Sequence, residues 1–465
     1  MEFQRDIYER LIQWKTDRTG RVLEISGARQ VGKTFILQKF AREQFDAFVY
    51  INMAENSGER FCRCLDKAED WEPGMPAGEE YVHEAVKLFA PDFEDTEDTV
   101  IVIDEIQESS RVYNLIRTFA RTFSAYVVVT RSYLGRLLEK DFFLPAGDVD
   151  AMTMGPLTFA EFAGVFDLRQ LYHTVDLFGG SQEMEYGQLR ECFALYQRIG
   201  GYPSVVRTYL IYRDEERCRG ELGRLMDIFV HESKRYLTNV MEVNAFEKLF
   251  HGIAVTLLRE KQGTEDLVEE LSSIVYKQES GRFTKKMIHN AIGWLQASHI
   301  IAYAGKCIDC NYLDVKENAR FYFQDLGVAS LFLTRAGADE ADIKGILAED
   351  FVFLSLLRRV SVDVAGTAPW SGTYEKTGGE LDFFVRSMKD HKNYGIEVKS
   401  GGSGARGRTA RALFDAHKLD YVYLLKGGSD GGRTESGRMM TVPLFLADRI
   451  SFSLGTESKG AGERI

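Results

Sequence analysis

The sequence "GARQVGKT" at residues 27–34 restricts the fold of this chain more than any other stretch. It follows the apolar run "RVLEIS", and a helical pattern begins directly after it. Glycines let such a loop wrap back on itself, so that its backbone N–H groups and the helix N-terminus converge on anionic oxygens. Lys33 then reaches the β- and γ-phosphates of a nucleotide, and the Thr34 hydroxyl ligates Mg²⁺. The predicted nucleotide-binding residues are Gly27, Ala28, Arg29, Gln30, Val31, Gly32, Lys33 and Thr34.

Strand and helix signals alternate over the first part of the chain, to about residue 165, which is typical of a parallel sheet with crossover helices. Short apolar runs predict strands at residues 21–26, 47–52, 99–104, 125–130 and 150–154. The run "TVIVID" at 99–104 is almost continuously apolar, as expected of a strand that is buried on both faces. Residues 55–98 are rich in Glu and Asp and predict a solvated helical insertion.

The strand "TVIVID" ends in two consecutive acids, Asp104 and Glu105. A carboxylate at the carboxyl end of a buried parallel strand faces the cleft where ligands bind in such sheets. Asp104 is predicted to hold Mg²⁺ through water, and Glu105 is predicted to orient and deprotonate the attacking water. Together with the glycine loop, this pair predicts a domain that binds ATP or ADP and hydrolyses ATP.

Length, composition and charge limit the number of domains, the location of the protein and the partners that it can bind. A chain of 465 residues corresponds to about two to four domains. It has no run of about 18 apolar residues and begins with a charged, amphipathic stretch, so we expect a cytoplasmic protein with no membrane partner. Cys307 and Cys310 form a C-x-x-C that predicts a turn with two reduced thiols, because a structural zinc needs four ligands. The net charge of −12 means that nucleic acid would be contacted only through local basic patches.

Four residues in the C-terminal third indicate either a metal-dependent nuclease or a surface ion pair. Asp382 lies in "ELDFF", and Glu397 and Lys399 lie in "GIEVKS", where alternate side chains of a strand face the same way. A hairpin between the two strands would bring these three catalytic candidates together, and Glu349 on the preceding helix would add a carboxylate. Asp382, Glu397 and Glu349 are the predicted metal ligands, with Lys399 near the developing charge. An E-x-K sequence on an exposed strand is also compatible with a solvated ion pair.

Two groups of basic residues are candidates for contact with DNA. A helix–helix–hairpin pattern between about residues 244 and 325 indicates a winged helix. Its second helix would carry a basic group into the major groove, namely Arg282, Lys285, Lys286 and His289. The wing itself is acidic, so an architectural or protein–protein role is equally open. The other basic group follows Glu397 and comprises Lys399, Arg406, Arg408, Arg411 and Lys418.

Further motifs give the chain a resemblance to a known family. "GARQVGKT", "VIDEIQ", "VVVTRSYLGRLL", "MGPLTFAEFA" and "GGYPSVV" resemble the bacterial and archaeal AAA-type ATPases that are fused to a winged helix and a restriction-endonuclease-like domain. "FYFQDLGVASLF", "GILAEDFVF", "GELDFFV" and "GIEVKSG" extend the resemblance to the C-terminal half. It implies an α/β fold made of a P-loop ATPase core at 1–165, a helical lid at 166–238, a winged helix at 239–325, an α/β restriction-endonuclease-like domain at 326–450 and a flexible tail at 451–465.

The resemblance also assigns individual residues. Thr130 and Ser132 fall where the family has its sensor for the γ-phosphate. Gly201 and Pro203 fall where related switch ATPases contact the nucleotide base from the lid. Arg131 stands where the family usually has glycine, and its side chain would either clash with the loop or add positive charge near the γ-phosphate.

Three functions are compatible with these predictions. In the first, ATP and Mg²⁺ order the lid and so position the winged helix and a Mg²⁺-dependent nuclease-like domain on DNA. In the second, the chain is a regulatory ATPase, acting in signalling or defence, whose C-terminal domain only binds or scaffolds. In the third, an active nuclease needs ATP only for assembly. Members of the family often assemble through a neighbour's arginine, which makes a homo-oligomer an expectation. Arg136 is a candidate for that role, although a solvated surface arginine is the favoured interpretation.

Overall fold

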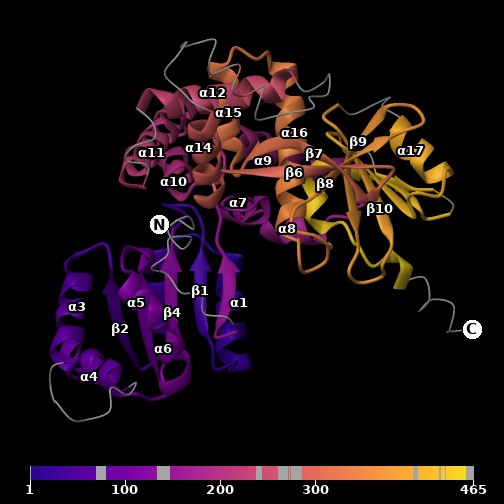
Figure 1. The fold of residues 1–465 in the computed structure, drawn as a ribbon. Helices are drawn as coiled ribbons and strands as arrows, with labels where there is room; N and C mark the ends of the chain where they lie inside the picture. Colours follow the sequence, from indigo (N-terminus) through magenta and orange to yellow (C-terminus); the bar gives the residue numbers. More distant parts are fainter. Residues whose placement is uncertain are drawn as a thin grey trace, which may run out of the picture. The chain divides into compact units, whose positions relative to one another are not determined.

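The computed structural model describes residues 2–69, 80–132, 147–236, 243–259, 271, 273, 285–401, 407–428, 431–434 and 436–456. The chain forms two compact units. The first unit comprises Met1–Leu157 together with a short later segment, Gly293–Ile300. The second unit comprises Thr158–Ile292 and Ile301–Ile465. Figure 1 shows the elements of both units along the chain.

The first unit is built on a five-stranded sheet in which all strands run parallel, in the order β2-β3-β4-β1-β5. The strands are β1 (Val22–Ser26), β2 (Ala47–Asn52), β3 (Thr99–Asp104), β4 (Tyr126–Arg131) and β5 (Val149–Thr153). All five strands predicted from the sequence are present to within about a residue at each end. Every residue of β1 and of β3 is buried, which is why their sequences are so apolar.

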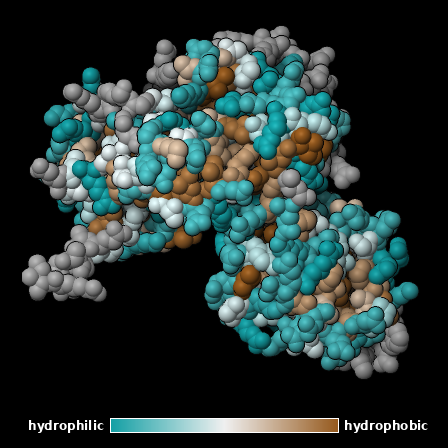
Figure 2. Space-filling model, turned by 180° about the vertical axis from the view of Figure 1, so that it is seen from behind, coloured by the Kyte–Doolittle hydropathy of each residue, from teal (hydrophilic) through white to brown (hydrophobic). Residues whose placement is uncertain are grey.

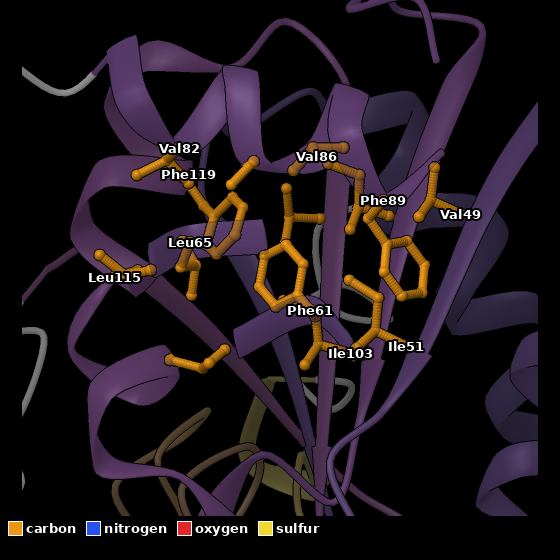
Figure 3. Packing of buried hydrophobic residues seen from close by; sticks show 14 of the residues in the cluster. Val49, Ile51, Phe61, Leu65, Val82, Val86, Phe89, Ile103, Leu115 and Phe119 are labelled. Atoms are coloured by element: carbon orange, nitrogen blue, oxygen red, sulfur yellow. The ribbon is translucent and has the colours of Figure 1, made fainter. Parts of the chain in front are cut away.

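Helices cover this sheet. They are α1 (Asp6–Asp17), α2 (Lys33–Gln44), α3 (Asn56–Glu69), α4 (Glu80–Phe89), η1 (Ile106–Glu108), α5 (Ser110–Asn114) and α6 (Ile116–Thr122). Figure 3 shows how Phe61 and Leu65 of α3, Val86 of α4 and Phe119 of α6 gather over Ile103 of the sheet. The described residues of the charged insertion predicted at 55–98 include the two helices α3 and α4, as expected, but these helices are not merely solvated. Their apolar residues form much of the core on one face of the sheet.

The strand order decides which side chains can meet. β4 pairs with β1 on one edge and with β3 on the other. The carboxyl ends of parallel strands meet at one edge of a sheet. The residues that end β4 therefore lie between the loop after β1 and the acids after β3, although these three segments are far apart in sequence.

Most helices of the second unit precede its first strand in the sequence, and the others follow later. They are α7 (Phe159–Val165), α8 (Arg169–Thr174), α9 (Glu183–Ile199), α10 (Pro203–Tyr212), α11 (Glu215–Tyr236), α12 (Val243–Arg259), α14 (Lys285–Ala297), α15 (Leu326–Arg335), α16 (Glu340–Leu357), α17 (Arg408–Asp415) and η4 (Leu444–Arg449). The last residues of α14, from Gly293, group with the first unit. Phe351 of α16 packs against Phe159 of α7 and Phe193 of α9, with ring centroids 6.2 and 4.7 Å apart. The expected lid and the expected C-terminal domain therefore share a core.

An eight-stranded mixed sheet organises the rest of the second unit, in the order β12-β13-β11-β10-β9-β8-β6-β7. Its strands are β6 (Ile301–Ile308), β7 (Asn311–Phe323), β8 (Trp370–Tyr374), β9 (Gly379–Arg386), β10 (Asn393–Lys399), β11 (Tyr421–Lys426), β12 (Gly432–Arg433) and β13 (Met439–Pro443). The β6–β7 hairpin, which the sequence assigns to a winged helix, pairs in parallel with β8. The boundary expected at residue 325 therefore falls within one continuous sheet rather than between two folded bodies.

Several details differ from the sequence predictions or lie beyond them. The short strands β8 and β13 and the helices α15 and α17 were not predicted. α12, α14 and the β6–β7 hairpin occur in the predicted order, but Arg282 and most of the segment between the two helices lie outside the described residues, so the winged helix stays a prediction. Cys307 and Cys310 are buried, free thiols at the β6–β7 turn.

The surface is mixed in character. On the face drawn in Figure 2, hydrophilic side chains predominate and apolar side chains occur in smaller groups among them. None of the helices in the described part of the chain has the length and apolar character needed to cross a bilayer.

We expect Phe61→Ala to lower the free energy of unfolding of the first unit by about 3–5 kcal/mol, because it empties a site at the centre of the core. Arg63→Ala is the matched control, since Arg63 lies on the same helix with an exposed side chain, and it should change stability by less than about 0.5 kcal/mol. Urea unfolding followed by circular dichroism measures both. Equal effects would contradict the assignment of α3 to the core.

Candidate functional site

The loop at residues 27–34 joins β1 to α2 through a tightly constrained backbone. Gly27 has φ 151°, and a Cβ added there would lie 1.9 Å from the carbonyl oxygen of Met154. Gln30 and Gly32 also adopt positive φ, at 60° and 98°. α2 begins at Lys33, immediately after Gly32. The loop therefore needs its glycines for close approach and for left-handed backbone, as the sequence motif predicts.

Lys33 is buried and its side chain folds back over the loop. Its Nζ donates hydrogen bonds to the carbonyl oxygens of Gly27 and Ala28, each at 2.8 Å. A positive charge is thus held within the loop, next to the N-terminus of α2, where both the charge and the helix dipole favour an anion.

Arg5, which precedes α1, anchors this loop and was not predicted. Its guanidinium donates to the carbonyl oxygen of Val31 at 2.8 Å and to that of Gly155 at 2.7 Å. These contacts tie the loop to the chain segment that follows β5. A single arginine ahead of an amphipathic helix carries no sequence signal of such a role.

Asp104, at the end of β3, is the centre of the predicted metal site. Its carboxylate is buried and accepts hydrogen bonds from the hydroxyls of Thr34 at 2.6 Å, of Tyr50 at 2.7 Å and of Thr130. The predicted Mg²⁺ ligands Thr34 and Asp104 therefore lie side by side. Tyr50 on β2 was not predicted, and its burial and then the charge of Asp104 raise its pKa above the ordinary value.

Glu105 is held by three neighbours at the same edge of the sheet. It has φ 52°, a left-handed backbone that is uncommon for glutamate. Its carboxylate accepts from Ser132 Oγ at 2.6 Å and from the amide of Gln107, and its backbone N–H donates to Thr130 Oγ1 at 3.0 Å. The structure thus brings together the predicted site residues Glu105, Thr130 and Ser132. Gln107, which also contacts Glu105, was not among the predicted residues.

Arg131 neither clashes with the loop nor stands free. Its guanidinium pairs with Glu24 of β1 at 2.6 Å, and both side chains are largely buried. Burial raises the pKa of Glu24, and the charge of Arg131 opposes that rise. At the position where the family usually has glycine, this chain therefore has an arginine that forms a buried ion pair. Its partner, Glu24, was not singled out in the sequence.

The lid residues carried over from the family lie in the second unit. Pro203 is the first residue of α10, and the backbone N–H of Gly201 donates to Asp325 Oδ2 at 2.7 Å. Asp325 also accepts from the N–H of Val328 and so caps α15. Burial raises the pKa of Asp325 to about 6. Contact of Gly201 and Pro203 with a nucleotide stays a prediction, and Arg136 lies outside the described residues.

The second cluster lies where β9 and β10 pair. The predicted hairpin is antiparallel, with Phe383 opposite Ile396. Lys399 Nζ lies 2.8 Å from Glu397 Oε1 and 4.0 Å from Asp382 Oδ2, and Asp382 Oδ2 accepts from the Val398 N–H at 2.6 Å. Asp382, Glu397 and Lys399 therefore converge as the spacing predicts.

Glu349, the fourth predicted residue of this site, forms an ion pair outside the Asp382, Glu397 and Lys399 cluster. It pairs with Arg320 of β7, a residue that was not singled out in the sequence. Burial raises the pKa of Glu349 and of Glu397 well above the ordinary value of a glutamate. Glu397 Oε2 is buried and has no hydrogen-bond partner in the described part of the chain, which suits a cation ligand. No group of three or more His, Cys, Asp or Glu side chains within that part is arranged to hold a metal, so a cation here would rest on Asp382 and Glu397.

The basic residues expected to contact DNA differ in their exposure and in their partners. Lys286 and His289 are exposed on α14, whereas Arg282 lies outside the described residues and the side chain of Lys285 is not described. Arg408 and Arg411 lie on α17, Lys418 pairs with Asp309 at 3.5 Å, and Arg406 lies outside the described residues.

A glycine loop between a strand and a helix, beside a buried Asp on a neighbouring strand, defines a P-loop nucleotide-binding domain. One family model agrees with this class: residues 19–163 match the model of an AAA domain. The chain thus carries an AAA-type ATPase domain over about that range. No curated protein gave a significant match to the sequence.

Solved structures give distant likenesses. A Walker-type ATPase of Pyrococcus abyssi is 12% identical, with a TM-score of 0.45, over 71% of this chain and 96% of that one. The ORC2 protein of Aeropyrum pernix, in ADPNP and ADP complexes, is 13% identical, with a TM-score of 0.35, over 75% and 94%. The ORC1 protein of the same organism, in complex with DNA, is 14% identical, with a TM-score of 0.30, over 75% and 93%. All three TM-scores are too low to define a shared fold.

We expect Arg131→Met to cost about 3–5 kcal/mol of stability, because it leaves the buried carboxylate of Glu24 without its partner. The double variant Glu24→Met/Arg131→Met removes both charges and should recover most of that loss. Thermal unfolding compares the two. If the single and double variants are equally unstable, the ion pair is not what holds these strands.

Proposed function

We propose that the first unit binds ATP with Mg²⁺ and hydrolyses it. The observation that supports this most strongly is the convergence of Thr34, Asp104 and Thr130, from three separate elements, at the end of the loop that carries Lys33. A hydroxyl and a carboxylate oxygen 2.6 Å apart are the oxygen ligands that Mg²⁺ takes in nucleotide sites, so the residues fit the metal. Thr34 and Asp104 would hold it, and it would neutralise charge on the phosphates.

The residues of this chain account for the other parts of the reaction. The loop N–H groups and Lys33 bind the terminal phosphates, since both present positive charge to the same place. Glu105 orients the attacking water and accepts its proton, and Ser132 and Gln107 hold its carboxylate in position. Thr130 fixes the backbone of Glu105 and contacts Asp104, so it lies where a sensor of the terminal phosphate is needed.

ATP turnover is proposed to serve as a switch for the second unit, with DNA as the substrate on which that unit acts. The support is the continuity of the β6–β7 hairpin with the sheet that carries Asp382 and Glu397. Assembly into a homo-oligomer and a cytoplasmic location belong to the same proposal.

Lys33→Ala should weaken ATP binding at least about 100-fold, because it removes the charge that meets the phosphates. Glu105→Gln should bind ATP normally but hydrolyse it at least about 100-fold more slowly, because an amide cannot accept the proton. Arg42→Ala, an exposed position on the same helix as Lys33, is the control and should match the wild type. Calorimetry with Mg-ATP and a phosphate-release assay measure these effects. Wild-type protein that binds neither ATP nor ADP would refute the proposal.

A second proposed function is metal-dependent cleavage of DNA by the second unit. The supporting observation is the unpartnered, buried Oε2 of Glu397 beside Asp382 and Lys399. Asp382 and Glu397 would hold a Mg²⁺ that activates water, and Lys399 would stabilise charge on the phosphate. The Arg320–Glu349 pair favours the alternative, a regulatory ATPase whose nuclease-like domain does not cut, because the carboxylate of one predicted metal ligand is already paired with a guanidinium.

If the nuclease proposal is correct, Asp382→Ala and Lys399→Ala should each reduce cleavage of DNA with Mg²⁺ or Mn²⁺ at least about 100-fold. Glu380→Ala is the matched control, because Glu380 lies on the same strand with a half-exposed side chain paired to Lys306. Gel assays on single-stranded, double-stranded and supercoiled DNA, with and without ATP, provide the readout. Absence of metal-dependent cutting by the wild type would leave the regulatory function.

A further inference from the structure

The carboxylate of Asp104 has a protein donor at each of its acceptor positions. A carboxylate offers about four such positions, two on each oxygen. Oδ2 accepts from the hydroxyls of Thr34 at 2.6 Å and of Tyr50 at 2.7 Å. Oδ1 accepts from the hydroxyl of Thr130, and it accepts from the Glu105 N–H at 3.1 Å. A water from the hydration shell of Mg²⁺ therefore reaches Asp104 only if one of these donors leaves.

The oxygen of Asp104 that such a water would approach is Oδ2. Thr34 is the other proposed ligand of Mg²⁺, and its hydroxyl bonds to this oxygen. A hydroxyl can ligate a metal through an oxygen lone pair while its O–H still donates, so Thr34 need not leave Oδ2. The second acceptor position on the same oxygen is taken by Tyr50. The hydroxyl of Tyr50 therefore occupies the place that the water needs.

The two donors to Oδ1 are less able to leave than Tyr50. Thr130 is fully buried, and its Oγ1 accepts from the Glu105 N–H at 3.0 Å while it bonds to Asp104. The Glu105 N–H belongs to the backbone. Tyr50 is instead partly exposed and lies on β2, an edge strand of the sheet. Rotation of its side chain can take the hydroxyl away from Asp104 without moving the backbone.

We propose that the Tyr50 hydroxyl holds the place on Asp104 Oδ2 that a water of Mg²⁺ takes, and that it leaves Asp104 when Mg²⁺ binds with nucleotide. This role rests on the proposed binding of nucleotide with Mg²⁺ and extends it to a residue of β2. Before the metal binds, Tyr50 satisfies part of a buried charge. Afterwards the water satisfies that part, so the hydroxyl competes with the metal. Tyr50 is a positioning residue that sets how much Mg²⁺ the site requires.

The first test compares the thermal midpoints of the wild type and Tyr50→Phe, without ligand and with saturating Mg-ADP. This substitution keeps the ring and removes only the hydroxyl. Without ligand, the variant lacks a hydrogen bond to a buried charge, so its midpoint should fall by about 3–6 °C. With Mg-ADP the bond is absent from both proteins, so the two midpoints should converge.

The second test measures ADP binding by calorimetry at a series of Mg²⁺ concentrations and in EDTA. Tyr50→Phe removes the competitor of the metal, so the half-maximal effect of Mg²⁺ on ADP affinity should require about 10-fold less Mg²⁺ than in the wild type. In EDTA the two proteins should bind ADP equally, because no donor has to leave Asp104. A merely structural role of Tyr50 would not change the Mg²⁺ requirement alone.

Tyr126→Phe is the matched control. Tyr126 lies at the other end of β4 from Thr130, and its hydroxyl donates to the carbonyl oxygen of Lys15 at 2.9 Å. Its loss should lower the midpoint by the same amount with and without Mg-ADP and leave the Mg²⁺ requirement unchanged. If the wild type binds no nucleotide with Mg²⁺, both proposals fail. If it binds Mg-ADP, but Tyr50→Phe keeps its midpoint deficit and needs as much Mg²⁺ or more, only the role of Tyr50 is wrong.

Discussion

The buried carboxylate of Asp104 is the constraint on which the first unit depends. A carboxylate that is 1% exposed must be satisfied by hydrogen bonds, or its desolvation would destabilise the fold. Its three hydroxyl partners come from α2, β2 and β4. Satisfying one buried charge therefore fixes the end of β3 against the phosphate loop and against the strand that ends in Thr130 and Ser132. The residues proposed for chemistry are held together by the requirements of folding.

Some buried polar groups of this protein are satisfied by partners within the fold, and others are not. Glu24 and Arg131 neutralise one another, and Asp325 is satisfied by backbone N–H groups of Gly201 and Val328. Such groups fix the packing of helices and strands. Glu397 Oε2 and His299 Nε2 are instead buried without a partner among the described residues. Glu397 lies in one cluster with Asp382 and Lys399, where its unsatisfied oxygen suits a cation.

The sequence predicts the elements and motifs that short stretches determine, but it does not predict contacts between residues that are far apart in the chain. The loop at 27–34 and the strands β1 to β4 were predictable because glycine spacing and continuous apolar runs determine them within a few residues. Arg5, Tyr50, Glu24 and Arg320 were not, since each acquires its role from a partner more than 25 residues away. The β6–β7 hairpin was predicted as such, but its pairing with β8 depends on a strand about sixty residues later, which no local pattern shows.

The chain passes directly from the later segment of the first unit, Gly293–Ile300, into the sheet of the second unit. Ile300 ends that segment, and β6 begins at the next residue. β6 pairs with β8, β8 with β9, and β9 with β10, so a continuous ladder of hydrogen bonds leads to Asp382 and Glu397. The β6–β7 hairpin is therefore part of the sheet that carries these carboxylates, which would not be true of a wing that folds alone.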